Sequence, residues 1–349
     1  GAGGGSIALP DVRGTIQVGP QSAGADPGPA CYGQGGGAAT LTDANLVLGY
    51  LDPDFFLGGE MSLDREASER VIDANIAVPL RLSMARAAWG IHEIVDEDVA
   101  RAFRIHASER GFDYRGSAMI AFGGSGPAHA MGVARKLGIP TVIFPASAGV
   151  MSALGLLASP LTFEVARTRQ VFVDALTADD FAATLAALEA EATAPLAVTG
   201  ADLTIRRRLD MRYHGQGHEI EVTLPDGAMV ADLPRIFREH YTAVHGAALL
   251  DAPLAITTWK VEAAAAPPEL ATAPPGAQGA AAPKGTRQAY FGEDYAATPV
   301  YDRYGLGVGA VIDGPALIEE RESTVVIGPD DKVEVDQHGN LVAELEVSS

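Results

Sequence analysis

Residues 118–144 read AMIAFGGSGPAHAMGVARKLGIPTVIF, and this stretch decides the fold class. Two short apolar runs, Ala118–Phe122 and Thr141–Phe144, flank a glycine-rich turn and a segment of helical periodicity at Ala128–Leu137. Strand, turn, helix and strand in this order form a βαβ unit, and short runs that are apolar throughout are typical of a buried parallel sheet. The sequence therefore predicts an α/β fold built around this unit.

Changes in periodicity divide the chain on either side of the unit. We expect residues 1–160 to form one lobe, with a helical insertion at about 60–112. Residues 161–263 show the order β-α-β-β-α-β, which matches a ferredoxin-like α+β domain. A linker rich in proline and alanine follows at 264–284, and short apolar runs separated by turns predict a C-terminal β domain at 285–349.

Local signals fix several expected helix ends. Asp64 and Thr177 each precede a helical pattern and are suited to cap it, while Gly111 is placed to end the long helix of the insertion. The tetrapeptide 42–45 (Thr-Asp-Ala-Asn) offers capping side chains for a short helix that runs through Leu48.

Composition excludes several classes of function. The 349 residues carry a formal net charge of −20, which argues against nucleic acid or an anionic membrane as partner. Cys31 is the single cysteine, so an intramolecular disulfide and a cysteine-based zinc cluster are excluded, and a cytoplasmic location is expected. No segment is interpreted as membrane-spanning, and the N-terminus has no signal-peptide pattern.

The turn Gly123, Gly124, Ser125 and Gly126 is the strongest candidate site. Glycines between a strand and a helix let a ligand approach the backbone, and the helix N-terminus favours an anion or a polar ring. The turn lacks the lysine of a Walker A loop and the third glycine of a dinucleotide fingerprint. Nucleotide binding and a merely tight βα turn both stay open on these residues.

A second group of residues is a candidate for substrate contact or for an interface. His129 lies in the first turn of the predicted helix, where it contacts a ligand or serves as a structural histidine. His214 and His218, four apart on an expected strand, face the same side, with Gln216 between them. Zinc usually needs three protein ligands, so no metal site is expected. Cys31 is a candidate nucleophile or a small buried residue.

Several motifs together resemble the hydantoinase A/5-oxoprolinase family, which includes subunits of acetone and acetophenone carboxylases. The resemblance runs almost from end to end, and the proline- and glycine-rich block is its most specific part. The motifs occupy residues 3–7 (GGGSI), 19–33 (GPQSAGADPGPACYG), 42–45 (TDAN), 122–127 (FGGSGP), 149–155 (GVMSALG), 212–216 (RYHGQ), 301–303 (YDR) and 314–316 (GPA).

The resemblance implies the second lobe of an actin/Hsp70/sugar-kinase-like fold that clamps ATP and Mg²⁺. The turn at 123–126 then corresponds to the adenosine-side element. The family's two Asp-Gly-Gly-Thr phosphate loops do not occur in this sequence, so the ligands of ATP and Mg²⁺ are expected mainly from a missing N-terminal half. The glycine run at the first residue also suggests a fragment, and the chain alone is expected to be inactive.

The function implied by the resemblance is that of an A-type subunit, here its C-terminal portion. The subunit would belong to an ATP-dependent hydrolase of hydantoin, 5-oxoproline or another lactam, which phosphorylates the amide oxygen of its substrate. The expected partners are the N-terminal half and a B-type hydantoinase subunit. The alternatives are a subunit of an ATP-dependent ketone carboxylase and a non-catalytic assembly subunit. The sequence identifies no catalytic residue and does not select the substrate.

Overall fold

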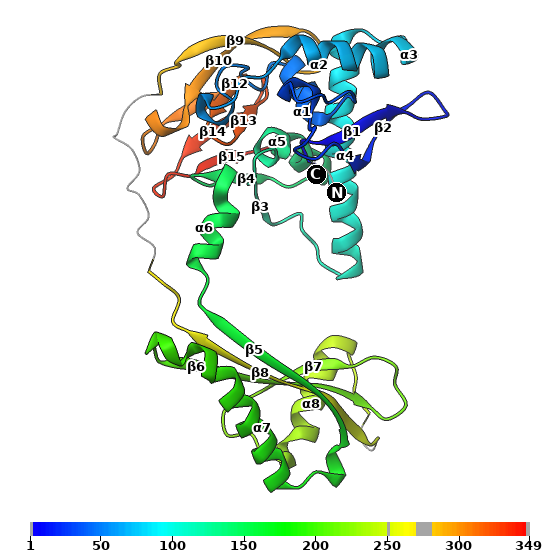
Figure 1. Cartoon of the computed structure of the whole chain (residues 1–349), viewed down its shortest axis with the longest axis vertical. Coiled ribbons are helices and arrows are strands. Elements are labelled where there is room, and N and C mark those ends of the chain that lie inside the picture. The colour runs from blue at the N-terminus through cyan, green and yellow to red at the C-terminus, as the bar shows by residue number, and fades with distance from the viewer. Residues whose placement is uncertain (1–2, 250–251, 270–280, 347–349) are drawn as a thin grey trace. The chain divides into compact units, whose positions relative to one another are not determined.

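The computed structural model describes residues 3–249, 252–269 and 281–346. The chain forms two compact units (Figure 1). The first unit comprises Gly1–Leu154 with Thr272–Ser349, and the second comprises Gly155–Ala271. Residues 270–280, the centre of the expected linker, lie outside the described residues.

A five-stranded sheet contains the predicted βαβ unit and lies in the first unit. Its strand order is β11-β14-β15-β4-β3, and β3 runs parallel to β4 as predicted. Helix α5 (Gly126–Leu137) connects these two strands and buries Met131, Val133 and Leu137 against the sheet. The strands are β3 (Ala118–Ile120), β4 (Thr141–Phe144), β11 (Val311–Asp313), β14 (Lys332–Val335) and β15 (Leu341–Glu344).

The expected separate β domain at 285–349 is not a separate unit. Strand β15 pairs with β4, with Val342 opposite Ile143, so the C-terminal strands complete the sheet of the βαβ unit. Pairing across about two hundred residues leaves no local signal in a sequence, whereas the apolar strands themselves are evident. A second sheet, of order β13-β12-β10-β9, consists of β9 (Gly285–Tyr290), β10 (Tyr295–Asp302), β12 (Ala316–Glu319) and β13 (Thr324–Ile327).

The N-terminal part of the first unit is a hairpin followed by helices. Thr40, rather than the expected residues 42–45, caps the helix that contains them, and Asp43 completes a capping box with it. Asp64 caps its helix as predicted. The elements are β1 (Ser6–Pro10), β2 (Ile16–Ser22), α1 (Leu41–Val47), α2 (Arg65–Ile72), α3 (Val78–Leu80) and α4 (Met84–Glu109). Leu41, Ile72 and Ile91 share one core, so the expected insertion is an integral part of the unit.

The second unit follows the predicted order β-α-β-β-α-β, but its strand order differs from the prediction. A ferredoxin-like sheet has its first and third strands at the centre, whereas the observed order, β5-β8-β6-β7, places the fourth and second strands there. All neighbouring strands are antiparallel. Helix α6 (Met151–Ala158) spans the boundary between the two units. The elements of the second unit are β5 (Thr162–Phe172), α7 (Ala178–Thr193), β6 (Leu203–Tyr213), β7 (Ile220–Leu224), α8 (Leu233–His245) and β8 (Leu254–Ala265).

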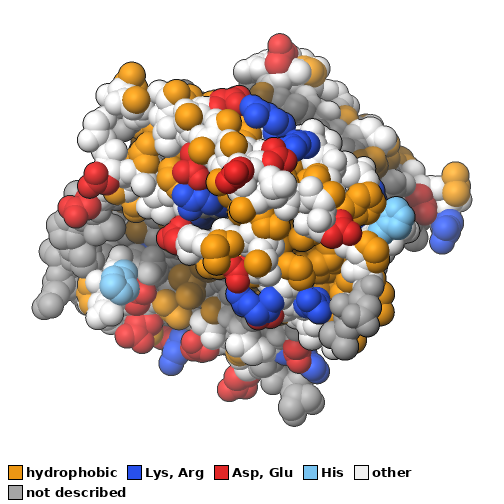
Figure 2. Space-filling view, turned by 90° about the horizontal axis from the view of Figure 1, so that it is seen from below, with side chains coloured by type: hydrophobic (Ala, Val, Ile, Leu, Met, Phe, Trp, Pro, Cys, Tyr) orange, Lys and Arg blue, Asp and Glu red, His pale blue; other side chains and the backbone are white. Residues whose placement is uncertain are grey.

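Residues 178–198 are, among the described residues, the one helical stretch long and apolar enough to cross a membrane, with a mean hydropathy of 1.3. In the structure Phe181, Leu185 and Leu188 are buried in one core with Trp259. The core of the second unit therefore accounts for the apolar face of this helix. On the face drawn in Figure 2, acidic, basic and hydrophobic side chains are interspersed.

Candidate functional site

The glycine turn lies between the end of β3 and the start of α5, and other segments surround it closely. Gly123 has a φ of +91°, which a residue with a side chain rarely adopts, and its N–H donates to the carbonyl of Ala148 at 2.8 Å. A Cβ on Gly124 would lie 3.3 Å from the carbonyl oxygen of Glu322. The turn therefore packs against both the 146–150 segment and the loop between β12 and β13.

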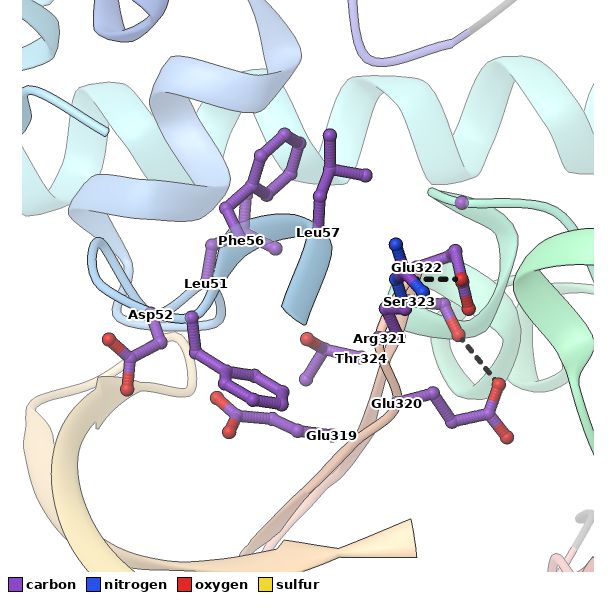
Figure 3. Close-up of a pocket in the computed structure, with 12 residues that line it drawn as sticks. Leu51, Asp52, Phe56, Leu57, Glu319, Glu320, Arg321, Glu322, Ser323 and Thr324 are labelled. Atoms are coloured by element: carbon purple, nitrogen blue, oxygen red, sulfur yellow. Dashed lines mark hydrogen bonds and ion pairs between the residues drawn. The ribbon is translucent and has the colours of Figure 1, made fainter. Parts of the chain in front are cut away.

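An acidic hollow borders Gly124. Its volume is about 30 Å³, which is enough for about two water molecules. Figure 3 shows its wall formed by the β12–β13 loop, facing Phe56 and Leu57, with the hydroxyl of Ser323 hydrogen-bonded to Glu320. The carboxylates on its lining belong to Asp52, Glu319, Glu320 and Glu322. Each of these carboxylates already pairs with an arginine: Asp52 and Glu319 with Arg287, Glu320 with Arg303, and Glu322 with Arg321. Because the pairs offset the negative charge, the hollow is suited to water or to hydroxyl groups.

A larger, apolar hollow borders Ser125 and Gly126. Its volume is about 190 Å³, below the roughly 300 Å³ at which complete ligand pockets begin. It is therefore suited to one part of a ligand, such as a planar base. The side chains around it are almost all apolar, and His129 is a polar exception. The lining comprises Leu41, Val95, Val99, Met119, Ala121, Ser125, Gly126, His129, Ala130 and Val133.

His129 takes part in a buried network of four side chains. Its Nδ1 lies 2.7 Å from Oδ1 of Asp96, and its Nε2 lies 3.4 Å from Nδ2 of Asn45. Oδ1 of Asn45 lies 2.9 Å from Nδ1 of His92. All four residues are buried, and they come from α1, α4 and α5. The network therefore joins three helices directly behind the glycine turn.

The geometry of the two imidazoles disfavours a shared metal ion. His92, Asp96 and His129 bring potential ligand atoms within 4.8 Å of one another. However, the rings of His92 and His129 are stacked, with centroids 4.2 Å apart and an interplanar angle of 21°. A metal ion bound by a histidine must lie near the plane of the imidazole ring. Because these two ring planes are nearly parallel, no single point lies in both planes at a bonding distance of about 2.1 Å from both nitrogens. Hydrogen bonding explains this cluster better than metal binding.

Burial sets the protonation of His92 and Asp96. Burial, aided by His129 and Lys136, holds the pKa of His92 well below its usual value of 6.5. Burial also raises the pKa of Asp96, although the hydrogen bond from His129 opposes this shift. His92 is therefore neutral at neutral pH.

We expect His92→Gln to reduce the fall in the free energy of unfolding as the pH decreases below 6.5. Because the pKa of His92 is lowered on folding, the unfolded chain binds a proton below pH 6.5 that the folded chain does not. Stability is therefore lost as the pH falls below that value, by about 1.4 kcal/mol per pH unit for a full proton. Unfolding titrations at several pH values measure the slope. His106→Gln, at an exposed site on α4, is the control. If His92→Gln has the same slope as the wild type, the lowered pKa of His92 is contradicted.

Cys31 is not exposed to a substrate in this structure. Only 1% of it is accessible, and its N–H donates to Oδ1 of Asp43 at 2.9 Å. Burial, with the charge of Asp43 next in importance, raises the pKa of the thiol far above its usual value. The structure therefore favours the buried structural role over the nucleophile.

The folded protein is accordingly expected to resist thiol reagents. Reaction of Cys31 with a disulfide reagent such as DTNB should be at least about 100-fold slower in the native chain than in the unfolded chain, because only an accessible thiolate reacts. Absorbance at neutral pH, with and without denaturant, follows the reaction of the single thiol. Equal rates in the two states would show that Cys31 is accessible.

His214, Gln216 and His218 lie in the second unit, in the turn that follows β6. The expectation that both histidines lie on a strand is wrong, because β6 ends at Tyr213 and β7 begins at Ile220. His214 and His218 are exposed. Nε2 of Gln216 donates to the hydroxyl of Tyr241 at 2.7 Å, which ties the turn to α8. The geometry thus gives Gln216 a structural contact.

The sequence prediction did not identify Asn45, His92 and Asp96. Asn45 enters the sequence analysis only as part of the expected capping segment 42–45, and His92 and Asp96 do not enter it. Their spacing contained a signal, because His92 and Asp96 are four residues apart and so share one face of a helix. The histidine that meets this face lies on another helix, which sequence periodicity alone does not show.

Two family models match almost the whole chain. The model described as Hydantoinase/oxoprolinase matches residues 1–165, and that described as Hydantoinase/oxoprolinase C-terminal domain matches residues 176–343. Among proteins, the chain is 35% identical over 357 residues to the caprolactamase subunit alpha of Pseudomonas jessenii, covering 96% of this chain and 50% of that protein. It is 34% identical over 375 residues to the acetophenone carboxylase gamma subunit of Aromatoleum aromaticum, covering 99% and 50%.

Solved structures agree with these matches. The nucleotide-free structure of acetone carboxylase superposes with a TM-score of 0.82 at 28% identity, covering 99% of this chain and 52% of that one. The ATP-dependent caprolactamase of P. jessenii superposes with a TM-score of 0.74 at 34% identity, with the same two coverages. The chain spans about half the length of the caprolactamase and acetophenone carboxylase subunits that it matches. Its mixed α/β fold, with several sheets, is shared with the matching half of these enzymes, and the chain belongs to the hydantoinase/oxoprolinase family.

Proposed function

We propose that the chain is part of a subunit of an ATP-dependent hydrolase of cyclic amides. Phosphorylating the amide oxygen of a hydantoin, a 5-oxoproline or another lactam would turn a poor electrophile into one that water attacks. The name of the P. jessenii relative, caprolactamase, supports this substrate class. The single observation that supports the role of this chain is the glycine turn between β3 and α5, which is bordered by an apolar hollow. Strand β3 runs parallel to β4, the strand that follows α5.

In this proposal the turn Gly123–Gly126 receives the base side of ATP. The N–H of Gly123 is bonded to Ala148, so the donors for a ligand come from the N-terminus of α5, and the apolar hollow of about 190 Å³ is suited to a purine. The fold is then the second lobe of an actin/Hsp70/sugar-kinase-like ATPase. Mg²⁺ and the phosphates would be held mainly by residues of an N-terminal half outside this sequence, so we expect this chain alone to be inactive.

The proposed partners are that N-terminal half and a B-type subunit. Relatives are named as alpha, beta and gamma subunits, which supports an assembly of several chains. Because the single cysteine is free and buried, a cytoplasmic location is proposed.

A second candidate function is ATP-dependent ketone carboxylation. The TM-score of 0.82 to acetone carboxylase and the identity to the acetophenone carboxylase subunit favour it. The dependence of ATP turnover on the substrate separates the two functions. A hydrolase is stimulated by a lactam or a hydantoin alone, whereas a carboxylase needs bicarbonate together with a ketone. A non-catalytic assembly subunit would show neither response.

The proposed nucleotide turn is tested by Gly124→Val. A Cβ at this position would lie 3.3 Å from the carbonyl oxygen of Glu322, so a valine forces the turn to shift away from the β12–β13 loop, and we expect at least about a tenfold loss of ATP affinity with the fold retained. Calorimetric titration of the protein with its accompanying chains gives the affinity, and far-ultraviolet circular dichroism gives the fold. Gly116→Val, just before β3 with open space around its Cβ position, is the matched control. Unchanged ATP affinity in Gly124→Val would remove the assignment.

A further inference from the structure

In the buried network behind the glycine turn, each contact determines which atom donates a hydrogen bond and which atom accepts it. Nδ2 of Asn45 is a donor, so the Nε2 of His129 that faces it must accept and carry no hydrogen. The hydrogen of a neutral His129 then lies on Nδ1, which faces the carboxylate of Asp96. Oδ1 of Asn45 accepts, so the Nδ1 of His92 must donate. With the amide of Asn45 in this orientation and Asp96 ionised, one arrangement of hydrogens on neutral imidazoles satisfies every contact, and it has both rings protonated on Nδ1.

Adding a proton to His129 reverses these donor and acceptor roles. A doubly protonated ring presents N–H on both sides, so Nε2 faces Asn45 as a donor and requires its oxygen. The amide of Asn45 must then turn over and present Nδ2 to His92, whose Nδ1 must become an acceptor. His92 would therefore carry its hydrogen on Nε2, which lies 3.7 Å from Oδ2 of Asp96. The side-chain amide of Asn45 couples the protonation of one imidazole to the tautomer of the other.

Ring stacking and charges confine both imidazoles. His92 is stacked between Trp89, at a centroid distance of 5.6 Å, and His129, at 4.2 Å. Lys136 of α5 forms an ion pair with Glu93 at 3.0 Å, on the side of α4 that carries the network. The titratable and charged groups around the two rings are Glu93 and Asp96 of α4, Arg135 and Lys136 of α5, Tyr50 after α1, and Tyr290 and Tyr295 of the β9–β10 hairpin.

The network is connected to the glycine turn through the first helical turn of α5. His129 is three residues beyond Gly126, where this helix begins, and it lines the apolar hollow together with Ser125 and Gly126. One helical turn further on, a Cβ on Gly132 would overlap the carboxylate of Asp96. The glycine allows α4 to approach α5 closely enough for Asp96 to reach His129. The position of the helix start thus depends on the contact between Asp96 and His129.

We propose that Asn45 and Asp96 are positioning residues of the nucleotide turn, which they hold in place by fixing the orientation and tautomer of His129. This inference rests on the proposed function, because it assigns the network to the same nucleotide site. Neither residue lines the apolar hollow, so both act through His129.

Nitrogen-15 NMR of the imidazoles in the protein with its accompanying chains tests the inference. In the wild type, both His92 and His129 should show a protonated Nδ1 and an unprotonated Nε2 at neutral pH. Asn45→Asp replaces the donor to His129 by an acceptor, so His129 should become protonated on Nε2. ATP affinity should fall about threefold to tenfold, the effect of one lost hydrogen bond. Asn75→Asp, at a site on the helical segment after α2, is the matched control.

A second variant covers the case in which Asn45→Asp does not fold. Asp96→Asn keeps the size of the side chain but removes the charge, and it should weaken ATP binding by a similar factor while leaving the far-ultraviolet spectrum unchanged. An Nε2–H tautomer of His129 in the wild type would overturn the inference. So would altered imidazole signals with ATP affinity unchanged, provided that Gly124→Val still lowers ATP affinity. If Gly124→Val also leaves binding unchanged, the proposed nucleotide site itself fails, and the positioning role fails with it.

Discussion

Asp43→Ala should lower the free energy of unfolding of the first unit by about 3–5 kcal/mol, because each unsatisfied buried donor costs about 1–3 kcal/mol. Asp43 is fully buried and accepts hydrogen bonds from five donors. These are the N–H groups of Ala30 at 3.3 Å, Cys31 at 2.9 Å and Thr40 at 3.1 Å, and the hydroxyls of Thr40 at 2.7 Å and Ser68 at 2.6 Å. The alanine variant leaves several of them without a partner.

The two tryptophans allow the units to be followed separately. Trp89 lies in the first unit and Trp259 in the second, so a Trp259→Phe background makes fluorescence report on the first unit alone. Asp43→Asn keeps one acceptor oxygen and should have an intermediate effect, and Asp54→Ala at an exposed turn is the control. A loss below about 1 kcal/mol in Asp43→Ala would show that its donors find other partners.

The second large effect is expected from Arg303→Ala, at about 3–5 kcal/mol. The side chains of Arg303 and Glu320 are only 5% and 1% exposed, and Nε lies 3.2 Å from Oε1. Arg303 also donates to the carbonyl of Gly339 at 2.6 Å, at the turn between β14 and β15. Burial lowers the pKa of Arg303, although Glu320 opposes this. Removing the arginine leaves a buried carboxylate without its cation.

The double variant Arg303→Met, Glu320→Gln is the informative comparison. It removes both charges, so it should be more stable than Arg303→Ala, since the cost of breaking a buried pair lies mainly in the charge left behind. The same Trp89 fluorescence measurement applies. Arg321→Ala breaks an ion pair between exposed side chains and should change stability little. If the single and double variants are equally unstable, lost packing rather than an unpaired charge explains the effect.

Features encoded by neighbouring residues could be predicted from the sequence. The apolar runs at 118–122 and 141–144 correctly indicated parallel β3 and β4, and Asp64 and Thr177 cap their helices as expected. The residues at 42–45 were assigned to the correct helix, but Thr40 is its cap. These features depend on periodicity and on side chains within one turn of a helix.

Features that depend on distant residues could not be predicted. The pairing of β15 with β4 and the strand order of the second unit are determined by which apolar faces cover one another, and many arrangements satisfy the same local pattern. The same holds for the candidate site. The glycine turn is visible as a motif, whereas the approach of Asn45, His92 and Asp96 to His129 requires three helices to be packed.

The central claim is that residues 123–126 form the base side of an ATP site, and photolabelling tests it most directly. The protein, purified with the chains that accompany it, is irradiated with 8-azido-ATP, digested with trypsin and analysed by mass spectrometry. Cleavage after Arg115 and Arg135 isolates residues 116–135, which contain the turn and His129. The account predicts a label within this peptide that an excess of ATP removes. A label confined to other peptides, or one that ATP does not displace, would contradict it.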